Sequence, residues 1–250
     1  MFMIRGLPID NLNKTEQKIP RVVEIVGLAG AGKTTLSQTL SIQNEHIHLS
    51  SFPDVRNIVY APFFIWQGFQ ITPTLLTLSR KDSRQLTRRE FAWLSILSGW
   101  PTTLQKELRK NRDIFILDQG PVYLLTEISE FGPNFLKKER SEQLWQTLYD
   151  RWAAMLDTIV WLDTTDELLI ERICSRDKKH VVKGESTQTI VEFLGRYRMA
   201  YERTLSKLTA NHSALKILVF DTSRQSPEEI ANHLLAEFDL KLPSQTTNLT

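Results

Sequence analysis

The chain has 250 residues, 41% hydrophobic and 24% charged, which is typical of a globular protein and favours one large α/β domain over two. Lys and Arg outnumber Asp and Glu by only 31 to 29, which excludes the broadly basic surface of a dedicated nucleic-acid-binding protein. The single cysteine, Cys174, excludes an intrachain disulfide, and no apolar run is long enough for a signal peptide core or a membrane span, so we expect a cytoplasmic protein.

The first part of the chain begins with a polar lead-in over residues 1–20. The apolar run VVEIV predicts a buried strand over 21–26, and helical character follows over 34–43. A second short strand is predicted over 46–51. From residue 58 to residue 110 the apolar periodicity is mostly helical.

Two prolines interrupt this helical region, and they predict breaks at Pro73 and at Trp100–Pro101. The next element is the continuous apolar run at 113–117, which ends in Asp118 and Gln119. Such a run suits a strand that is covered on both faces.

The remaining chain alternates helices and strands. Helices are predicted at 122–130, 134–155, 166–175, 189–208 and 227–238. Strands are predicted at 158–162 and 215–220, and the polar, basic residues 177–187 predict a loop. Five strands separated by helices predict a parallel sheet with helices on both faces, which binds ligands beyond the carboxyl ends of its strands.

The stretch GLAGAGKTTL follows the first predicted strand and opens the first predicted helix. It matches G-x-x-x-x-G-K-[ST], a loop whose backbone N–H groups wrap a polyphosphate and whose turns leave no room for side chains. Lys33 would reach the transferred phosphate, and the Thr34 hydroxyl would ligate Mg²⁺. The residues expected to hold the nucleotide are Gly27, Leu28, Ala29, Gly30, Ala31, Gly32, Lys33, Thr34 and Thr35.

GLAGAGKTTLSQTL resembles the P-loop of the nucleoside monophosphate kinase superfamily, especially its thymidylate kinase-like and deoxynucleoside kinase-like branch. The segments FILDQGP, IVWLDTTDELLIERICSR and ILVFDTSRQSPEEIANHLL agree with it in order, so the resemblance covers about residues 21–238. It implies an α/β fold, the P-loop NTPase three-layer sandwich with a five-stranded parallel sheet. The kinase domain would span 21–239, with a helical acceptor insert at about 55–110, a basic lid at about 176–187 and a frayed tail over 240–250.

Asp118 stands at the carboxyl end of a predicted strand, where a carboxylate can hold the metal or accept the proton of an attacking hydroxyl. The alternative is an aspartate that caps the next helix. The resemblance gives Asp118 the place of the acidic residue in the family's Asp-Arg motif. Here Gln119 follows instead, so the arginine that would grip an acceptor phosphate is missing at that position.

Phosphoryl transfer concentrates negative charge, and Arg172 and Arg176 are four residues apart at the entrance to the basic loop. The resemblance implies that they act as catalytic cations, Arg176 first, when the lid closes. It also suggests that Asp54, Arg56 and Arg84 bind the acceptor, and that Thr222 and Ser223 lie against the donor base. Asp54 is equally a turn residue, and Thr222 and Ser223 equally cap the last helix.

Other groups of residues have two interpretations each. The basic residues of the insert bind an anionic part of the acceptor or form a solvated face, and they are Arg80, Lys81, Arg84, Arg88 and Arg89. Four aromatic residues could stack on a base or sugar, but core packing is the better default for each. They are Trp66, Phe69, Trp93 and Trp100.

The sequence therefore predicts a kinase of thymidylate kinase type that uses ATP and Mg²⁺ to phosphorylate a nucleotide or nucleoside. Its expected partners are a nucleoside triphosphate and a small-molecule acceptor, with no nucleic acid and no membrane, and a homodimer is left open. Two alternatives remain: a kinase of a non-nucleotide metabolite such as a sugar or an antibiotic, and a P-loop ATPase or nucleotide switch that acts with a protein partner.

Overall fold

A computed structural model describes residues 22–54, 56–79, 84–110, 113–177, 180–210 and 212–240. The predicted lead-in over 1–20 and all but the first residue of the predicted tail lie outside this part of the chain. Five parallel strands form one sheet in the order β2-β3-β1-β4-β5. They are β1 (Val22–Gly27), β2 (Ile47–Ser50), β3 (Ile114–Asp118), β4 (Thr158–Asp163) and β5 (Lys216–Asp221).

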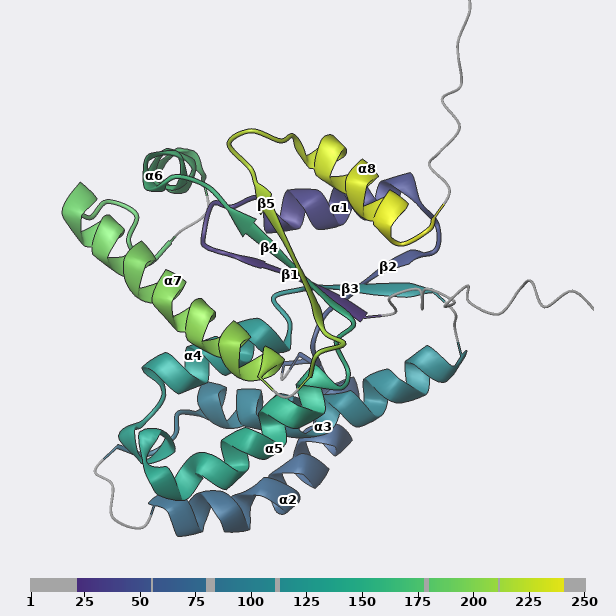
Figure 1. Ribbon diagram of the computed structural model, residues 1–250. Helices are drawn as coiled ribbons and strands as arrows, with labels where there is room; N and C mark the ends of the chain where they lie inside the picture. The colour runs from purple at the N-terminus through teal and green to yellow at the C-terminus, as the bar shows by residue number, and fades with distance from the viewer. Residues whose placement is uncertain are drawn as a thin grey trace, which may run out of the picture.

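Helices cover both faces of this sheet (Figure 1). They are α1 (Lys33–Gln43), α2 (Ala61–Ser79), α3 (Arg88–Lys110), α4 (Pro121–Phe131), α5 (Glu142–Ala153), α6 (Asp166–Ser175), α7 (Thr187–Thr209) and α8 (Pro227–Glu237). Helices α1 and α8 lie on one face, and α4 and α7 lie on the other, with α3, α5 and α2 packed beyond them. The predicted α/β three-layer architecture with a five-stranded parallel sheet is confirmed.

The centre of the sheet is apolar on both faces because helices cover both. Every residue of β1 is buried, and so are the first four residues of β3 and the first five of β4. Strand β5, at the edge, is less covered, and Val219 is 66% exposed. This gradient follows from position in the sheet, since a central strand has a neighbour on either side and a helix above and below.

The predicted breaks at Pro73 and Pro101 are wrong, because both prolines lie inside helices, α2 and α3. Pro101 is buried in a helix of 23 residues whose apolar face packs into the core. Helix α2 buries Ile71, Leu75 and Leu78. Packing of these faces holds the helices together where proline removes a backbone hydrogen bond, so tertiary contacts override the local preference.

The single helix predicted over 134–155 is also wrong at its start, where two short 3₁₀ turns, η2 (Asn134–Lys137) and η3 (Glu139–Ser141), precede α5. Side chains satisfy the backbone here. The Ser141 hydroxyl donates to the carbonyl oxygen of Leu136 at 2.8 Å, and the Trp145 ring N–H donates to the same oxygen at 2.6 Å. A third 3₁₀ turn, η1 (Ile58–Tyr60), leads into α2.

The four singled-out aromatic residues divide into two pairs. Trp93 and Trp100 are buried on α3, as core packing predicts. Trp66 and Phe69 on α2 are 62% and 75% exposed, so the expectation that they pack in the core is wrong. None of the helices described by the structure is long and apolar enough to cross a bilayer.

Candidate active site

The P-loop joins β1 to α1 beyond the carboxyl end of the central strand. Gly27 lies so close to β4 that a Cβ atom there would stand 2.4 Å from the carbonyl oxygen of Leu162, so only glycine fits. Gly32 has open space around it but a φ of 93°, a left-handed conformation that other residues rarely adopt. Gly32 also begins α1 without a side-chain cap, so the first-turn N–H groups face the loop, as an anion site requires.

Lys33 folds over this loop. Its ammonium group donates to the carbonyl oxygens of Gly27 at 2.9 Å and of Leu28 at 3.0 Å. Burial lowers the pKa of Lys33 to about 8; the nearby Asp118 carboxylate raises it, and the Arg176 guanidinium lowers it. The side chain therefore sits where a phosphate chain would lie in the loop, and an anion there would stabilise its charged form.

Thr34 and Asp118 meet across the mouth of the loop. The Thr34 hydroxyl donates to Oδ2 of Asp118 at 2.8 Å, although 84 residues separate the two in sequence. The other carboxylate oxygen, Oδ1, is buried and has no hydrogen-bond partner among the residues that the structure describes. A hydroxyl and a carboxylate oxygen are hard ligands of the type that Mg²⁺ prefers, so these two residues fit the predicted metal site.

Asp118 does not cap the following helix, which was the alternative interpretation. The buried carboxylate of Glu24, on β1, does so: it accepts the backbone N–H groups of Val122 at 2.9 Å and of Tyr123 at 3.2 Å. Burial raises the pKa of Glu24 to about 8 against the opposing effect of these hydrogen bonds. Sequence reasoning missed this residue, whose only signal is a charged side chain within an apolar run.

The turn between β3 and α4 is tight around this carboxylate. A Cβ atom on Gly120 would stand 2.8 Å from Cδ of Glu24, so glycine is required there. Gln119 has a φ of 61°, which is unusual for a residue with a side chain. Gln119 is exposed, follows Asp118 in the chain and lines a cavity of about 760 Å³. The residue that follows Asp118, where the resemblance implied an arginine, thus lines this cavity.

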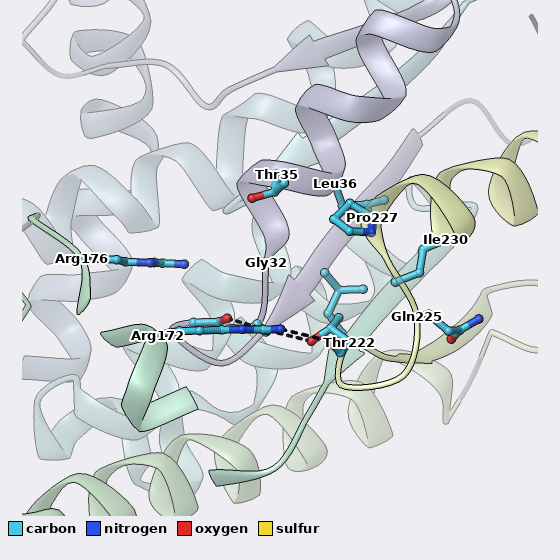
Figure 2. Close-up of a pocket in the computed structure, with 12 residues that line it drawn as sticks. Gly32, Thr35, Leu36, Arg172, Arg176, Thr222, Gln225, Pro227 and Ile230 are labelled. Atoms are coloured by element: carbon cyan, nitrogen blue, oxygen red, sulfur yellow. Dashed lines mark hydrogen bonds between the residues drawn. The ribbon is translucent and has the colours of Figure 1, made fainter. Parts of the chain in front are cut away.

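Arg172 and Arg176 have different surroundings. Arg172 donates through Nη1 to the carbonyl oxygen of Gly30 at 3.2 Å and to the Thr222 hydroxyl at 3.0 Å, and through Nη2 to the carbonyl oxygen of Thr222 at 3.0 Å. It therefore joins the P-loop to the loop between β5 and α8 (Figure 2). Arg176 follows α6 and is exposed, and it lines both cavities.

The smaller cavity, of about 250 Å³, lies beside the P-loop, where Arg172 meets Thr222 (Figure 2). Its floor and walls come from the P-loop, α6 and the start of α8, and include Gly30, Thr35, Arg172, Thr222, Gln225 and Pro227. Ser223 does not line it, because its backbone N–H and hydroxyl both donate to Oδ1 of Asp221, at 2.8 and 2.6 Å. The cap of α8 is Ser226, in a capping box with Glu229, and not Thr222 or Ser223.

The larger cavity, of about 760 Å³, lies between the P-loop, α4, α7 and the loop that follows α6. Its lining is cationic near the P-loop, with Lys33 and Arg176. Along α4 and α7 it is mainly aromatic, with Tyr123, Phe193, Tyr197 and Tyr201 beside Glu127. Glu127 is held inside it by the Tyr197 hydroxyl, which donates to Oε1 at 2.8 Å. The cavity can thus take a ligand with an anionic end and a flat, uncharged body.

Arg89 is the member of the basic cluster that reaches this cavity. Its guanidinium lies 4.2 Å from the centre of the Trp93 ring. Arg84 instead donates to Oε1 of Glu90 at 2.6 Å and lines neither cavity, while Arg80 and Lys81 lie outside the described residues. Sequence reasoning named the cluster but did not single out Arg89, since nothing local distinguishes one arginine of the cluster from the next.

Asp54 and Arg56 lie apart from both cavities. Both are exposed, and Oδ1 of Asp54 accepts the backbone N–H of Arg56 at 2.9 Å, the geometry of a turn residue. Their assignment to the acceptor site stays a prediction, and so does that of Arg84. The structure brings together the P-loop, Asp118, Arg172, Arg176 and Thr222.

Comparisons with known proteins give the fold a name. No family model and no curated protein sequence matches the chain. Among solved structures, thymidylate kinase from Candida albicans is 16% identical over 88% of this chain and 91% of its own, with a TM-score of 0.50. Deoxyadenosine kinase from M. mycoides with bound dATP is 13% identical over 87% of this chain and 98% of its own, with a TM-score of 0.46. The protein has the thymidylate kinase-like α/β P-loop kinase fold.

Proposed function

We propose that the protein is an ATP-dependent phosphotransferase whose acceptor is a nucleoside or a nucleoside monophosphate. The contact between Thr34 and Asp118 carries this proposal, because it places a hydroxyl and a carboxylate at the junction of the P-loop and the larger cavity. ATP would lie with its base in the smaller cavity and its phosphates in the loop. The acceptor would fill the larger cavity.

The site residues divide the work of transfer. Thr34 and Asp118 would hold Mg²⁺, which would supply positive charge beside the phosphates of ATP. Lys33 would exchange its contacts with loop carbonyl groups for phosphate oxygens, and Arg176 would add a second cation as negative charge spreads in the transition state. An acceptor oxygen forms a bond to the γ-phosphorus as the bond from that phosphorus to ADP breaks. Where the acceptor is a hydroxyl, it also gives up a proton, which Asp118 would accept if Thr34 holds Mg²⁺ without it.

The walls of the larger cavity support a flat acceptor. Tyr123 lies on α4 and Phe193 and Tyr197 on α7, so aromatic rings face the space from both helices. A nucleobase offers the matching flat surface. Tyr197 and Glu127 form a hydrogen-bonded pair, and their polar groups can also contact a base or a sugar.

Gln119 favours a second candidate acceptor, a neutral alcohol such as a nucleoside, a sugar or another metabolite. The residue after Asp118 has an uncharged amide side chain that lines the larger cavity. A phosphate on the acceptor gains least from such a side chain, since an arginine would offer it two charge-assisted hydrogen bonds. Acceptors with and without a phosphate must therefore be compared directly.

An ADP-release screen of the full chain with Mg²⁺ and ATP tests the proposal. The panel contains nucleosides, nucleoside monophosphates and sugars, and we expect ADP release to depend on one class of acceptor. Lys33→Ala should lower the rate at least about 100-fold, whereas Lys106→Ala, an exposed lysine on α3, should leave it unchanged. ATP hydrolysis that proceeds equally without any acceptor would instead support the ATPase or switch, and a Lys33→Ala variant with full activity would remove the proposed site.

A further inference from the structure

A histidine lines the larger cavity beside the cations of the site. His180 lies in the loop between α6 and α7, four residues after Arg176 in the chain. It shares the cavity with the P-loop and with the aromatic side chains of α7. Its side chain is neither fully buried nor fully exposed, so a ligand in the cavity can reach it.

The surroundings of His180 place it between two parts of the cavity. Its ring meets the Phe193 ring edge to face, with the ring centres 5.7 Å apart and the planes at 90°. Burial lowers the pKa of His180, and the positive charges of Arg176 and Lys33 lower it further. The ring therefore lies where the aromatic wall of the cavity adjoins its cationic end.

The loop also determines which ring nitrogen carries the proton. Nδ1 of His180 accepts the backbone N–H of Val182 at 3.4 Å, so Nδ1 itself holds no proton. Because the pKa of His180 is lowered, the ring is neutral at neutral pH and its one proton is on Nε2. Within the part of the chain that the structure describes, no residue accepts a hydrogen bond from this Nε2–H group.

We propose that His180 is a further catalytic residue, whose Nε2–H group donates a hydrogen bond to the γ-phosphoryl group as it passes from ATP to the acceptor. This inference rests on the function proposed above, which places the phosphates near Lys33 and Arg176 and the acceptor along the aromatic wall. The group that is transferred crosses the boundary between the two, where His180 lies.

A fixed donor at this boundary lowers the barrier to transfer. Negative charge spreads over the phosphoryl oxygens in the transition state, and a donor already in place stabilises that charge more than it stabilises bound ATP. The ring keeps its proton and forms no covalent bond. The bond between the γ-phosphorus and the acceptor oxygen forms as the bond to ADP breaks.

Two other roles for His180 make different predictions. A general base needs an unprotonated nitrogen that is free to receive a proton, and Nδ1 is already bound by the N–H of Val182. A residue that only packs against Phe193 needs an aromatic ring and no N–H group. Variants that keep either the ring or the donor therefore separate these roles.

Steady-state kinetics of such variants test the proposal. His180→Phe keeps a ring beside Phe193 but removes the donor, so kcat should fall about 100-fold while KM for ATP changes by less than about 3-fold. His180→Gln places an amide N–H near the position of Nε2 and should keep kcat within about 10-fold of the wild-type value. His46→Gln is the matched control, because His46 is exposed and precedes β2, at the end of the sheet opposite the P-loop.

The two variants of His180 can each contradict the proposal. Wild-type kcat in His180→Phe would overturn it, because packing of the ring would then suffice. A His180→Gln variant as slow as His180→Phe would also overturn it, because a donor alone would then not restore transfer. Thermal melts check that the variants fold.

NMR of the unaltered chain tests the proposal without turnover. The ring signals of His180 are those, among the five histidines, that His180→Gln lacks. At about pH 7.5 we expect the Nε2–H tautomer, and we expect its signal to change when Mg²⁺ and a non-hydrolysable ATP analogue bind.

These measurements separate failure of the proposal from failure of the proposed function. An Nδ1–H tautomer, or binding of the analogue by calorimetry without any change in the Nε2–H signal, would overturn the role of His180 and leave the kinase activity in place. Absence of acceptor-dependent transfer by the wild-type chain would overturn both.

Discussion

The protonation of the Lys33 side chain should be linked to the binding of a polyphosphate in the P-loop. Its ammonium group is bound by two carbonyl oxygens of the loop that it serves, and its pKa is lowered to about 8 by burial. The free protein therefore holds Lys33 only partly protonated at slightly alkaline pH. A polyphosphate in the loop would favour the charged form and raise this pKa.

Binding of ATP should therefore take up a proton above about pH 8. Because the folded, free protein loses this proton as the pH passes about 8, affinity for ATP should fall as the pH rises above that value. Calorimetry of ATP binding at pH 8.5, in two buffers with different ionisation enthalpies, measures the uptake. Lys33→Met should abolish it. Binding by the wild-type chain with no proton uptake would contradict the role of Lys33.

At the scale of elements, α6 delivers two arginines with different tasks. Arg172 lies within the helix and joins the P-loop to the loop that precedes α8, while Arg176 lies just beyond the helix, at the start of the loop that leads to α7. The fixed arginine shapes the smaller cavity. The exposed Arg176 is the candidate to meet the transferred phosphate. The sequence predicts a catalytic role for both arginines, and separate substitutions test that prediction.

Substitution should separate the two. Arg172→Ala should raise KM for ATP about 10-fold and change kcat little, because three hydrogen bonds that shape the donor site are lost. Arg176→Ala should lower kcat about 100-fold with little change in KM for ATP, because its charge acts mainly in the transition state. Steady-state kinetics with the acceptor found by the screen provide both values. Equal effects of the two variants on kcat would show that Arg172 also acts on the phosphates.

Arg172→Lys extends this comparison. A lysine keeps the charge but has no planar fork to reach both oxygens of Thr222 at once. It should therefore resemble Arg172→Ala in KM for ATP. Full recovery with lysine would mean that charge, and not the shape of the donor site, is what Arg172 supplies.

At the scale of the whole molecule, Glu24 makes stability depend on pH. Its pKa is about 8 when folded and close to the ordinary 4.5 when unfolded. Between these values the folded protein binds one more proton than the unfolded chain, so this residue makes the free energy of unfolding decrease as the pH rises, by about 1 kcal/mol per pH unit. Below pH 4.5 both states hold the proton and the contribution is constant.

Urea unfolding at a series of pH values checks this prediction. Glu24→Gln should weaken the fall in stability between about pH 5 and pH 7.5, since the amide cannot titrate but still accepts a backbone hydrogen bond. Glu171→Gln, an exposed glutamate on α6, should leave the wild-type pH dependence unchanged. An identical pH dependence in the wild type and Glu24→Gln would mean that Glu24 is charged in the folded protein at neutral pH.

The sequence by itself determined the P-loop, the five strands and the order of helices between them. Each of these depends on local patterns: glycines at fixed spacing, a lysine and a hydroxyl in succession, and apolar periodicity over a few residues. The helix over 166–175 was predicted with its observed bounds for the same reason. A local pattern needs no knowledge of what lies across the sheet.

Only the tertiary structure decided which side chains meet. Glu24 caps a helix 98 residues away, and Arg172 binds Thr222 at a distance of 50 residues. The same holds for the helices that continue through Pro73 and Pro101, which packing supports against local preference, and for Trp66 and Phe69, which face solvent because α2 lies outside α3. These outcomes depend on how elements far apart in the chain pack together, and no local pattern encodes that arrangement.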